Sequence, residues 1–282
     1  MVKAIRVHEL GGPEVRKWED VEIGEPKDGE IKVKNKAIGL NFCDTYFRNG
    51  FFKASAFPFT PAVLETGMEA VGMVTAVGPG VTGRMAGDLV AYAGYPMGAY
   101  AEDSWWSGSL LCQWANALGA TVIGTVSTKE KAAQAKEDGC HHVILYKEED
   151  FVALVNEITS GKGVEVVYDS VGKDTFEGSL KCLKLCGHMM SFGSSSGAPD
   201  PVPLSSALLL KSLSLTSPNM IYYTITRDEL LQTASEVFTN VAAGVLRVRV
   251  NHTYPLSQAA QAHTDLESRK TSGSVVLIPD GS

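Results

Sequence analysis

Short apolar runs separated by Gly- and Pro-rich turns fill the first part of the chain, up to about residue 103. Within these runs apolar and polar residues alternate, or β-branched residues follow one another. A two-residue period bounded by turn residues is typical of β-strands. This region is therefore predicted to form a small, mostly β domain, with strands at 2–7, 30–40, 68–77 and 88–92.

From about residue 109 the pattern changes to strands that alternate with amphipathic helices. Strands are predicted at 121–126, 142–146, 164–169 and 188–192, and a closing strand at 274–278. Helices are predicted at 110–118, 129–138, 150–159 with Asp150 as its cap, 174–183, 227–243 and 257–266. Strands that alternate with helices of this length imply a parallel sheet covered on both faces.

Composition narrows the class of protein. The 282 residues are 44% hydrophobic and 20% charged, which suits one large domain or two of ordinary size with a sizeable core. The net charge of −7 comes without a basic stripe, which argues against a nucleic-acid partner. Five cysteines without a CxxC pair do not indicate a zinc ribbon or a disulfide framework. With no long uncharged apolar run and no signal-like start, we expect a cytoplasmic protein without a membrane partner.

Candidate ligand-binding residues follow the first of the alternating strands. In an open parallel sheet, ligands bind at the carboxyl ends of the strands, and an NAD site usually has an acidic residue at this tip. Here the tip carries Ser127, Thr128 and Lys131 at the start of a helix, which would suit the 2′-phosphate of NADPH. An ordinary capped helix with solvated lysines is the alternative interpretation.

Three further strand ends carry residues suited to a nucleotide. Tyr146 follows the second strand, where its ring could stack on an adenine. Gly172, in the run Asp169-Ser170-Val171-Gly172, would let a ligand approach the backbone. The loop FGSSSG from Phe192 offers N–H groups and hydroxyls. Each feature alone is more typical of a turn, but their occurrence at the ends of one sheet favours a nucleotide pocket.

A phosphate-binding glycine loop is missing from this pattern. A dinucleotide fold opens with a strand, a G-x-G-x-x-G loop and a helix. Only Ser107-Gly108-Ser109 precedes the helix at 110–118, and residues 101–106 do not read as a Val- and Ile-rich strand.

Several longer motifs carry a family resemblance. They are HELGGPEV from His8, NKAIGLNFCDTYFR from Asn35, GMEAVGMVTAVGPGV from Gly67, VYDSVGKDTFEGSL from Val167 and LESRKTSGSVVLIP from Leu266. With them, nearly the whole chain resembles NADPH:quinone oxidoreductases of the zeta-crystallin type, in the medium-chain dehydrogenase/reductase superfamily.

The resemblance implies an α/β fold made of two domains. A GroES-like β domain would span 1–103 and be completed by 250–282, and a Rossmann-like doubly wound parallel sheet would span 104–249. Against the family pattern, about fifty residues are lost before Ser107, a size that matches a strand–loop unit with a helix and linker. The Rossmann-like sheet is therefore expected to lack its first strand and Gly-rich loop. Residues 62–66, Phe52 and Ser217 also depart from the family.

The resemblance also implies site residues. The nicotinamide side would be lined by Asn41, Phe42, Asp44, Thr45 and Tyr46. The adenosine phosphate would be held by Ser127, Thr128 and Lys131, and the cofactor wall completed by Tyr146, Val171, Ser195, Ser196, Tyr223 and Arg269. No metal is expected, because Asn41 and Met68 stand where zinc-containing relatives place Cys and His.

The implied reaction is transfer of a hydride or electrons from NADPH to a quinone, by a protein expected to be a homodimer. Tyr46 could donate to the developing quinol oxygen and Arg48 could stabilise its charge, although a packing role for Tyr46 and a surface role for Arg48 are equally compatible with the sequence. Phe51, Phe52 and Phe57 would form an apolar cleft for a flat substrate. Two alternatives stay open: a catalytically impaired variant that associates with an intact paralogue, and an enoyl or alkenal reductase of the same superfamily.

Overall fold

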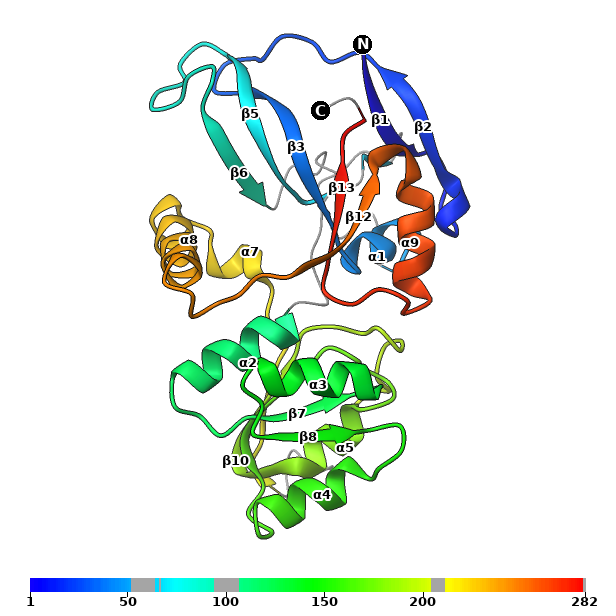
Figure 1. The fold of residues 1–282 in the computed structure, drawn as a ribbon, viewed down its shortest axis with the longest axis vertical. Helices are drawn as coiled ribbons and strands as arrows, with labels where there is room; N and C mark the ends of the chain where they lie inside the picture. Colours follow the sequence, from blue (N-terminus) through cyan, green and yellow to red (C-terminus); the bar gives the residue numbers. More distant parts are fainter. Residues whose placement is uncertain (52–63, 66, 94–106, 204–210, 281–282) are drawn as a thin grey trace. The chain divides into compact units, whose positions relative to one another are not determined.

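The computed structural model of the chain describes all residues except 52–63, 66, 94–106, 204–210 and 281–282. It divides into two compact units (Figure 1). Unit 1 consists of Met1–Gly108 and Val248–Ser282, and unit 2 consists of Ser109–Arg247. Each unit has its own core.

Unit 1 is built on two sheets. The larger has the order β12-β13-β3-β5-β6, formed by Val250–Pro255, Ser274–Ile278, Ile31–Leu40, Glu69–Val77 and Leu89–Ala93. β12 and β13 are parallel, and the other neighbouring strands of this sheet are antiparallel. The pairing of β13 with β3 places the C-terminal segment of the chain beside β3. The smaller has the order β2-β1-β4, formed by Arg16–Val21, Val2–Val7 and Leu64–Glu65.

Four short helical segments complete the described part of unit 1: η1 (Pro13–Val15), α1 (Cys43–Arg48), η3 (Leu256–Gln258) and α9 (Ala259–Glu267). Alternate residues of β13 point inward, so that Val275 and Leu277 are buried. They join one apolar core with residues from β1, β3, β5 and α9: Ile5, Ile38, Leu40, Ala70, Ala259, Ala262 and Leu266. Burial of this apolar area is the main force that closes the unit.

Unit 2 contains parallel strands and helices. One sheet pairs β7 (Ile123–Val126) with β8 (His142–Leu145), and the other has the order β11-β10-β9. The second sheet comprises Ser214–Thr216, Leu183–Ser191 and Val164–Asp169. The helices are α2 (Ser107–Ala117), α3 (Lys129–Glu137), α4 (Phe151–Ile158), α5 (Phe176–Cys182), α7 (Met220–Tyr223) and α8 (Arg227–Ala242).

The strands β7 and β9 each have one sheet neighbour among the described residues. Their two sheets share one apolar cluster, in which Ile123 of β7 and Val164 of β9 pack around the buried Ile144. On β9, Tyr168 is 52% exposed, which is unusual for a strand of a doubly wound sheet because such strands are buried on both faces. Unit 2 therefore contains two parallel half-sheets joined by side-chain packing rather than one continuous ladder.

The described elements confirm every strand and helix predicted from the sequence, to within a few residues at the ends. Asp150 caps α4 as predicted, because its Oδ1 accepts hydrogen bonds from the N–H groups of Val152 and Ala153 at 3.0 and 3.1 Å. The prediction missed β2, β4, β11, β12, α1 and α7, and β10 begins at Leu183 rather than at residue 188. In the described part of the chain, no helix has the length and apolar character needed to cross a bilayer.

Candidate functional site

The carboxyl ends of β7 and β8 lie side by side and gather four of the predicted cofactor-binding residues. Val126 is opposite Leu145 in the parallel ladder, and the N–H of Tyr146 donates to the carbonyl of Val126 at 3.1 Å. Ser127 comes next in the chain, and Thr128 caps α3, its hydroxyl accepting from the N–H of Lys131 at 3.3 Å. Hydroxyls, a lysine and an aromatic ring thus meet at one edge of unit 2.

The carboxyl end of β9 is organised by a buried carboxylate. Asp169 accepts four hydrogen bonds, from the N–H groups of Val171 and Gly172 at 2.8 and 2.9 Å and from the hydroxyls of Thr175 and Ser179 at 2.8 and 2.7 Å. An ionised group that accepts this many bonds is well satisfied inside the protein. Asp169 therefore fixes the turn that carries Val171 and starts α5.

A second loop, at the end of β10, is joined to this turn. The hydroxyl of Ser196 donates to the carbonyl of Val171 at 2.7 Å, and the N–H of Ser195 donates to the carbonyl of Ser170 at 3.2 Å. The backbones approach so closely that a Cβ on Gly193 would lie 2.6 Å from the Ser170 oxygen. The structure thus brings together Val171, Ser195 and Ser196, as the sequence predicted.

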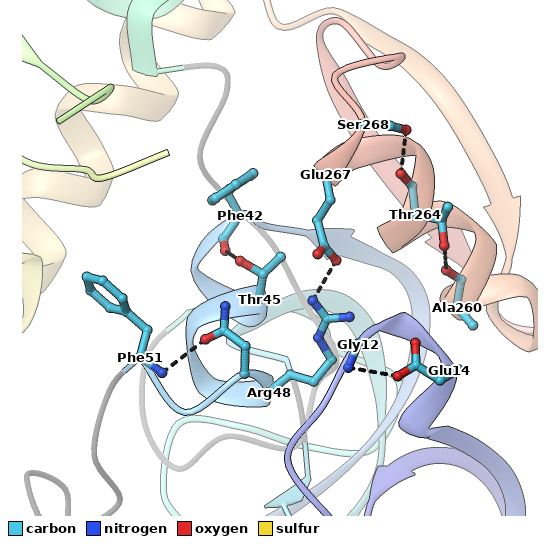
Figure 2. Close-up of polar contacts among 11 residues, drawn as sticks. Gly12, Glu14, Phe42, Thr45, Arg48, Phe51, Ala260, Thr264, Glu267 and Ser268 are labelled. Carbon is cyan, nitrogen blue, oxygen red and sulfur yellow. Dashed lines mark hydrogen bonds and ion pairs between the residues drawn. The ribbon is translucent and has the colours of Figure 1, made fainter. Parts of the chain in front are cut away.

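In unit 1, the predicted nicotinamide-side residues surround the start of α1 (Figure 2). The hydroxyl of Thr45 donates to the carbonyl of Phe42 at 2.6 Å, and the N–H of Asn41 donates to the Asp44 carboxylate at 2.9 Å. The Tyr46 ring lies 5.6 Å from that of Phe42, edge to face, and 4.8 Å from that of Phe51. Tyr46 is therefore part of an aromatic group, as a packing role requires.

Arg48 lies inside the protein rather than on its surface, so the surface interpretation was wrong. Its side chain is 1% exposed, and its Nη2 donates to the Glu267 carboxylate on α9 at 2.6 Å (Figure 2). The Arg16, Asp44 and His263 side chains are buried with it. This ionic cluster ties α1 to α9 and to the start of β2, and it sets the position of α1.

Burial shifts the pKa values of three members of this cluster. Desolvation raises the pKa of Asp44 to about 8, although the Asn41 N–H and Arg16 oppose the shift. Desolvation and the charge of Arg48 lower the pKa of Arg16 to about 9. The pKa of His263 falls well below its ordinary value because of burial and the positive charges of Arg16 and Arg48. His263 is therefore a neutral imidazole at pH 7.

The predicted site residues form two clusters in unit 2, at the ends of β7 and β8 and at the ends of β9 and β10, and one cluster in unit 1 at the start of α1. Unit 2 also contains Tyr223, which is 58% exposed on α7, and unit 1 contains Arg269, whose backbone has a φ of 59° in the turn after α9. Phe52 and Phe57 of the predicted cleft lie outside the described residues. Sequence reasoning missed Arg16, His263 and Glu267, because charged residues in a strand or helix are usually solvated.

The residues at the expected zinc position do not suit zinc. Asn41 offers a carboxamide, and Met68 offers a thioether that accepts from the Cys43 thiol at 3.8 Å. Zinc in proteins is held by thiolate, imidazole or carboxylate groups. Cys43 is the one zinc-type ligand of these three, and no cluster of three or more His, Cys, Asp or Glu side chains that could hold a metal occurs in the described ranges.

Comparison with known proteins shows a full-length similarity. Residues 27–143 match the alcohol dehydrogenase GroES-like domain, and residues 108–236 match the zinc-binding dehydrogenase family. Quinone oxidoreductase 1 of Escherichia coli is 41% identical, with 99% of this chain and 100% of that protein covered. The 2-haloacrylate reductase of a Burkholderia species is 37% identical, with 99% of each chain covered. The crystal structure of an Escherichia coli quinone oxidoreductase complexed with NADPH matches with a TM-score of 0.90 at 40% identity, covering 99% and 100% of the two chains.

The aligned length exceeds the length of this chain. The alignment with the Escherichia coli protein runs over 332 positions, 50 more than the 282 residues present here, although it covers nearly all of both proteins. About 50 positions of that relative thus have no counterpart in this chain.

The close approach of the two strand-end loops predicts a sensitive glycine. We expect Gly193→Ala to destabilise unit 2 by about 2 kcal/mol, because its Cβ would overlap the Ser170 carbonyl and force the loops apart. Gly108→Ala is the matched control, since nothing lies within 4 Å of its Cβ position. Urea unfolding measures both, and equal stability of the two variants would show that the loops are not tightly joined.

The ion pair between the buried Arg48 and the partly exposed Glu267 predicts a large cost when Arg48 is replaced. Arg48→Met would leave Glu267 without its partner and lower the unfolding free energy by about 3 kcal/mol. Lys181→Met is the control, because Lys181 and Glu177 form an exposed pair within one helix whose loss costs about 0.5 kcal/mol or less. Similar losses in thermal or urea unfolding would contradict the buried position of Arg48.

The neutral His263 predicts a pH effect on stability. The pKa of His263 is lowered in the folded protein, so as the pH falls below 6.5 the unfolded chain takes up a proton at this residue and the folded chain does not. Proton uptake stabilises the unfolded state, and the free energy of unfolding therefore falls on acidification. The loss reaches about 1.4 kcal/mol per pH unit. His263→Gln should therefore flatten the dependence of unfolding free energy on pH between 6.5 and 5, whereas His142→Gln, at an exposed strand position, controls for removal of an imidazole. An unchanged slope in His263→Gln would show that the ring is charged in the fold.

Proposed function

Since this chain belongs to the quinone oxidoreductase family of the medium-chain dehydrogenases and reductases, we propose that it reduces a quinone with NADPH. The observation that carries the proposal is the gathering of Ser127, Thr128, Lys131 and Tyr146 at the carboxyl ends of β7 and β8. Similarity to a quinone oxidoreductase crystallised with NADPH supports the choice of cofactor.

The preference for NADPH over NADH follows from the residues after β7. Hydroxyls and a lysine at the start of α3 favour a phosphate dianion, since the helix start adds a positive potential. The residues that directly follow β7, Ser127 and Thr128, are uncharged, whereas an NAD site usually has an acidic residue there; the nearest carboxylate is that of Glu130 in the first turn of α3, which is hydrogen-bonded by the Thr128 side chain. We assign Ser127, Thr128 and Lys131 to the 2′-phosphate and Tyr146 to the adenine, with Val171, Ser195, Ser196 and Tyr223 along the remaining wall.

Unit 1 is proposed to supply the nicotinamide and substrate side. The Asn41 side chain is fully buried, and neither its Oδ1 nor its Nδ2 has a partner in the described structure. Such an amide is costly unless a ligand satisfies it, and the nicotinamide carboxamide has the matching donor and acceptor. Phe42, Asp44 and Thr45 complete this side in the proposal, and Arg269 completes the cofactor wall.

The chemistry divides between cofactor and protein. NADPH supplies the hydride when bound. Tyr46, whose ring contacts those of Phe42 and Phe51, is the proposed proton donor to the quinol oxygen, and this aromatic group suits a flat ring. Arg48 is buried and its Nη2 is bonded to Glu267, so we assign it to positioning α1 rather than to contact with substrate. No zinc is required, because Asn41 and Met68 are poor zinc ligands.

The proposal includes a shortened cofactor domain. We infer that the GroES-like domain comprises 1–103 and 250–282, and that the Rossmann-like domain at 104–249 lacks its first strand and Gly-rich loop. The two half-sheets of unit 2 support this, since among the described residues β7 and β9 each leave one edge unpaired, which one further strand could bridge. The 50 aligned positions of the Escherichia coli relative that exceed the length of this chain match the size of the segment inferred to be missing. Residues 102–106, at the inferred junction, lie outside the described residues.

Two alternatives rest on specific observations. The similarity to 2-haloacrylate reductase favours reduction of an activated carbon–carbon double bond by the same site. The open edges of β7 and β9 favour a catalytically impaired chain that pairs with an intact paralogue, since unpaired strand edges recruit other strands. Turnover of a quinone, of an acrylate, or of neither separates the three, and sedimentation tests the homodimer that we also propose.

The cofactor assignment predicts a charge effect at Lys131. In steady-state reduction of a benzoquinone, Lys131→Glu should raise the KM for NADPH about tenfold and leave that for NADH nearly unchanged, because only NADPH carries the 2′-phosphate. Lys129→Glu, two residues earlier in the same helix, is the matched control and should change the KM for NADPH about threefold or less. Equal effects on the two cofactors would contradict the assignment, and no oxidation of NADPH above background would contradict the proposed activity.

A further inference from the structure

Two of the five free cysteines lie against each other in unit 2. Cys112 is on α2, and Cys140 follows α3 and directly precedes β8. Their sulfur atoms are 3.3 Å apart, and the thiol of Cys140 donates a hydrogen bond to the sulfur of Cys112. The proposed NADPH and quinone chemistry uses neither residue.

The surrounding structure holds both sulfur atoms in place. A Cβ on Gly124 of β7 would lie 2.7 Å from the Cys140 sulfur, so the absence of a side chain there makes room for the thiol. The backbone N–H of Cys140 donates to the Ala135 carbonyl at 3.0 Å, after a turn in which Gly139 has a φ of +95°. Cys140 is thereby fixed between β7 and α2.

A buried polar network fixes α2 on the other side of the pair. The carboxylate of Asp138, at the end of α3, accepts from the Ser109 hydroxyl at 2.6 Å and from the Gln113 amide at 3.1 Å. Gln113 in turn accepts from the backbone N–H of Arg247 at 2.7 Å. Because Ser109 and Gln113 flank Cys112 on α2, the helix that carries Cys112 is anchored to the turn that carries Cys140.

We propose that Cys112 and Cys140 are a redox-active pair that a hydroperoxide converts into a disulfide joining α2 to the start of β8. A disulfide needs a sulfur–sulfur distance of about 2.05 Å, so the two atoms have little more than 1 Å to close. Rotation of the side chains supplies such a movement without displacement of the helices.

The chemical steps follow from the hydrogen bond and the exposure of the two thiols. The hydrogen bond from Cys140 lowers the pKa of Cys112, although burial and Asp138 oppose the shift, and Cys112 is also the more exposed of the two. The Cys112 thiolate attacks the hydroperoxide, the O–O bond breaks, and a sulfenic acid forms as hydroxide or alkoxide leaves. The sulfur of Cys140 then attacks the sulfenic sulfur, the S–S bond forms and water leaves, so that two thiols are oxidised by two electrons and the hydroperoxide is reduced.

The direct test uses the full-length protein and hydrogen peroxide. After treatment with an equimolar amount, alkylation and digestion without reductant, mass spectrometry should find one peptide pair joined through Cys112 and Cys140 and released by dithiothreitol. Titratable thiols should fall from five to three. Alkylated Cys112 and Cys140, a different pairing, or sulfinic acid on Cys112 without a cross-link would overturn the proposal.

Cysteine variants and a melting measurement distinguish oxidation of this pair from oxidation of the other cysteines. Cys112→Ser and Cys140→Ser should each abolish the cross-link, whereas Cys186→Ser, which removes an exposed cysteine, should leave it intact. The bond would close a loop between residues 28 apart, so the oxidised wild type should melt about 5 °C or more above the reduced form. An oxidised form that melts no higher than the reduced form would overturn the claim that the disulfide joins α2 to the start of β8.

Discussion

The structure of unit 2 depends on one constraint. A central strand of a parallel sheet must form hydrogen bonds with a neighbouring strand on each side. Among the described residues, β7 bonds only to β8 and β9 only to β10. What joins the two half-sheets is the apolar cluster around Ile144, to which α4 and α5 contribute. The proposed cofactor-binding residues of unit 2 that follow its strands lie at the carboxyl ends of these half-sheets, so their geometry relies on this side-chain packing.

In unit 1, buried charged side chains hold the short helix α1 in position. Arg48 and Arg16 are buried beside Asp44 and the neutral His263, and burial of the Arg48 charge depends on its pairing with Glu267. The cluster connects α1 with α9, which comes from the other end of the chain (Figure 2). The aromatic and amide groups proposed for the nicotinamide side are therefore held by residues distant in sequence.

The sequence predicted the elements with a strong pattern and missed those without one. β13 is a run of β-branched and apolar residues after a glycine, and α4 has both a cap and an apolar stripe, so both were predictable. α1 spans only Cys43–Arg48 and β2 reads as mainly charged, so neither has a periodic signal. For the site, strand-end residues such as Ser127 and Ser196 were found because a parallel sheet brings its carboxyl ends together. The burial of Arg48 could not be predicted, since it depends on Glu267, 219 positions away.

The central claim is that this shortened chain still binds NADPH through its residues at the ends of β7 and β8. Calorimetric titration of the folded wild-type protein with NADPH and with NADH tests it most directly. Saturable binding of NADPH, tighter than NADH by about tenfold or more, is the result that the 2′-phosphate contacts predict. Equal affinity for the two cofactors, or no saturable heat with a sample shown to be folded, would contradict it.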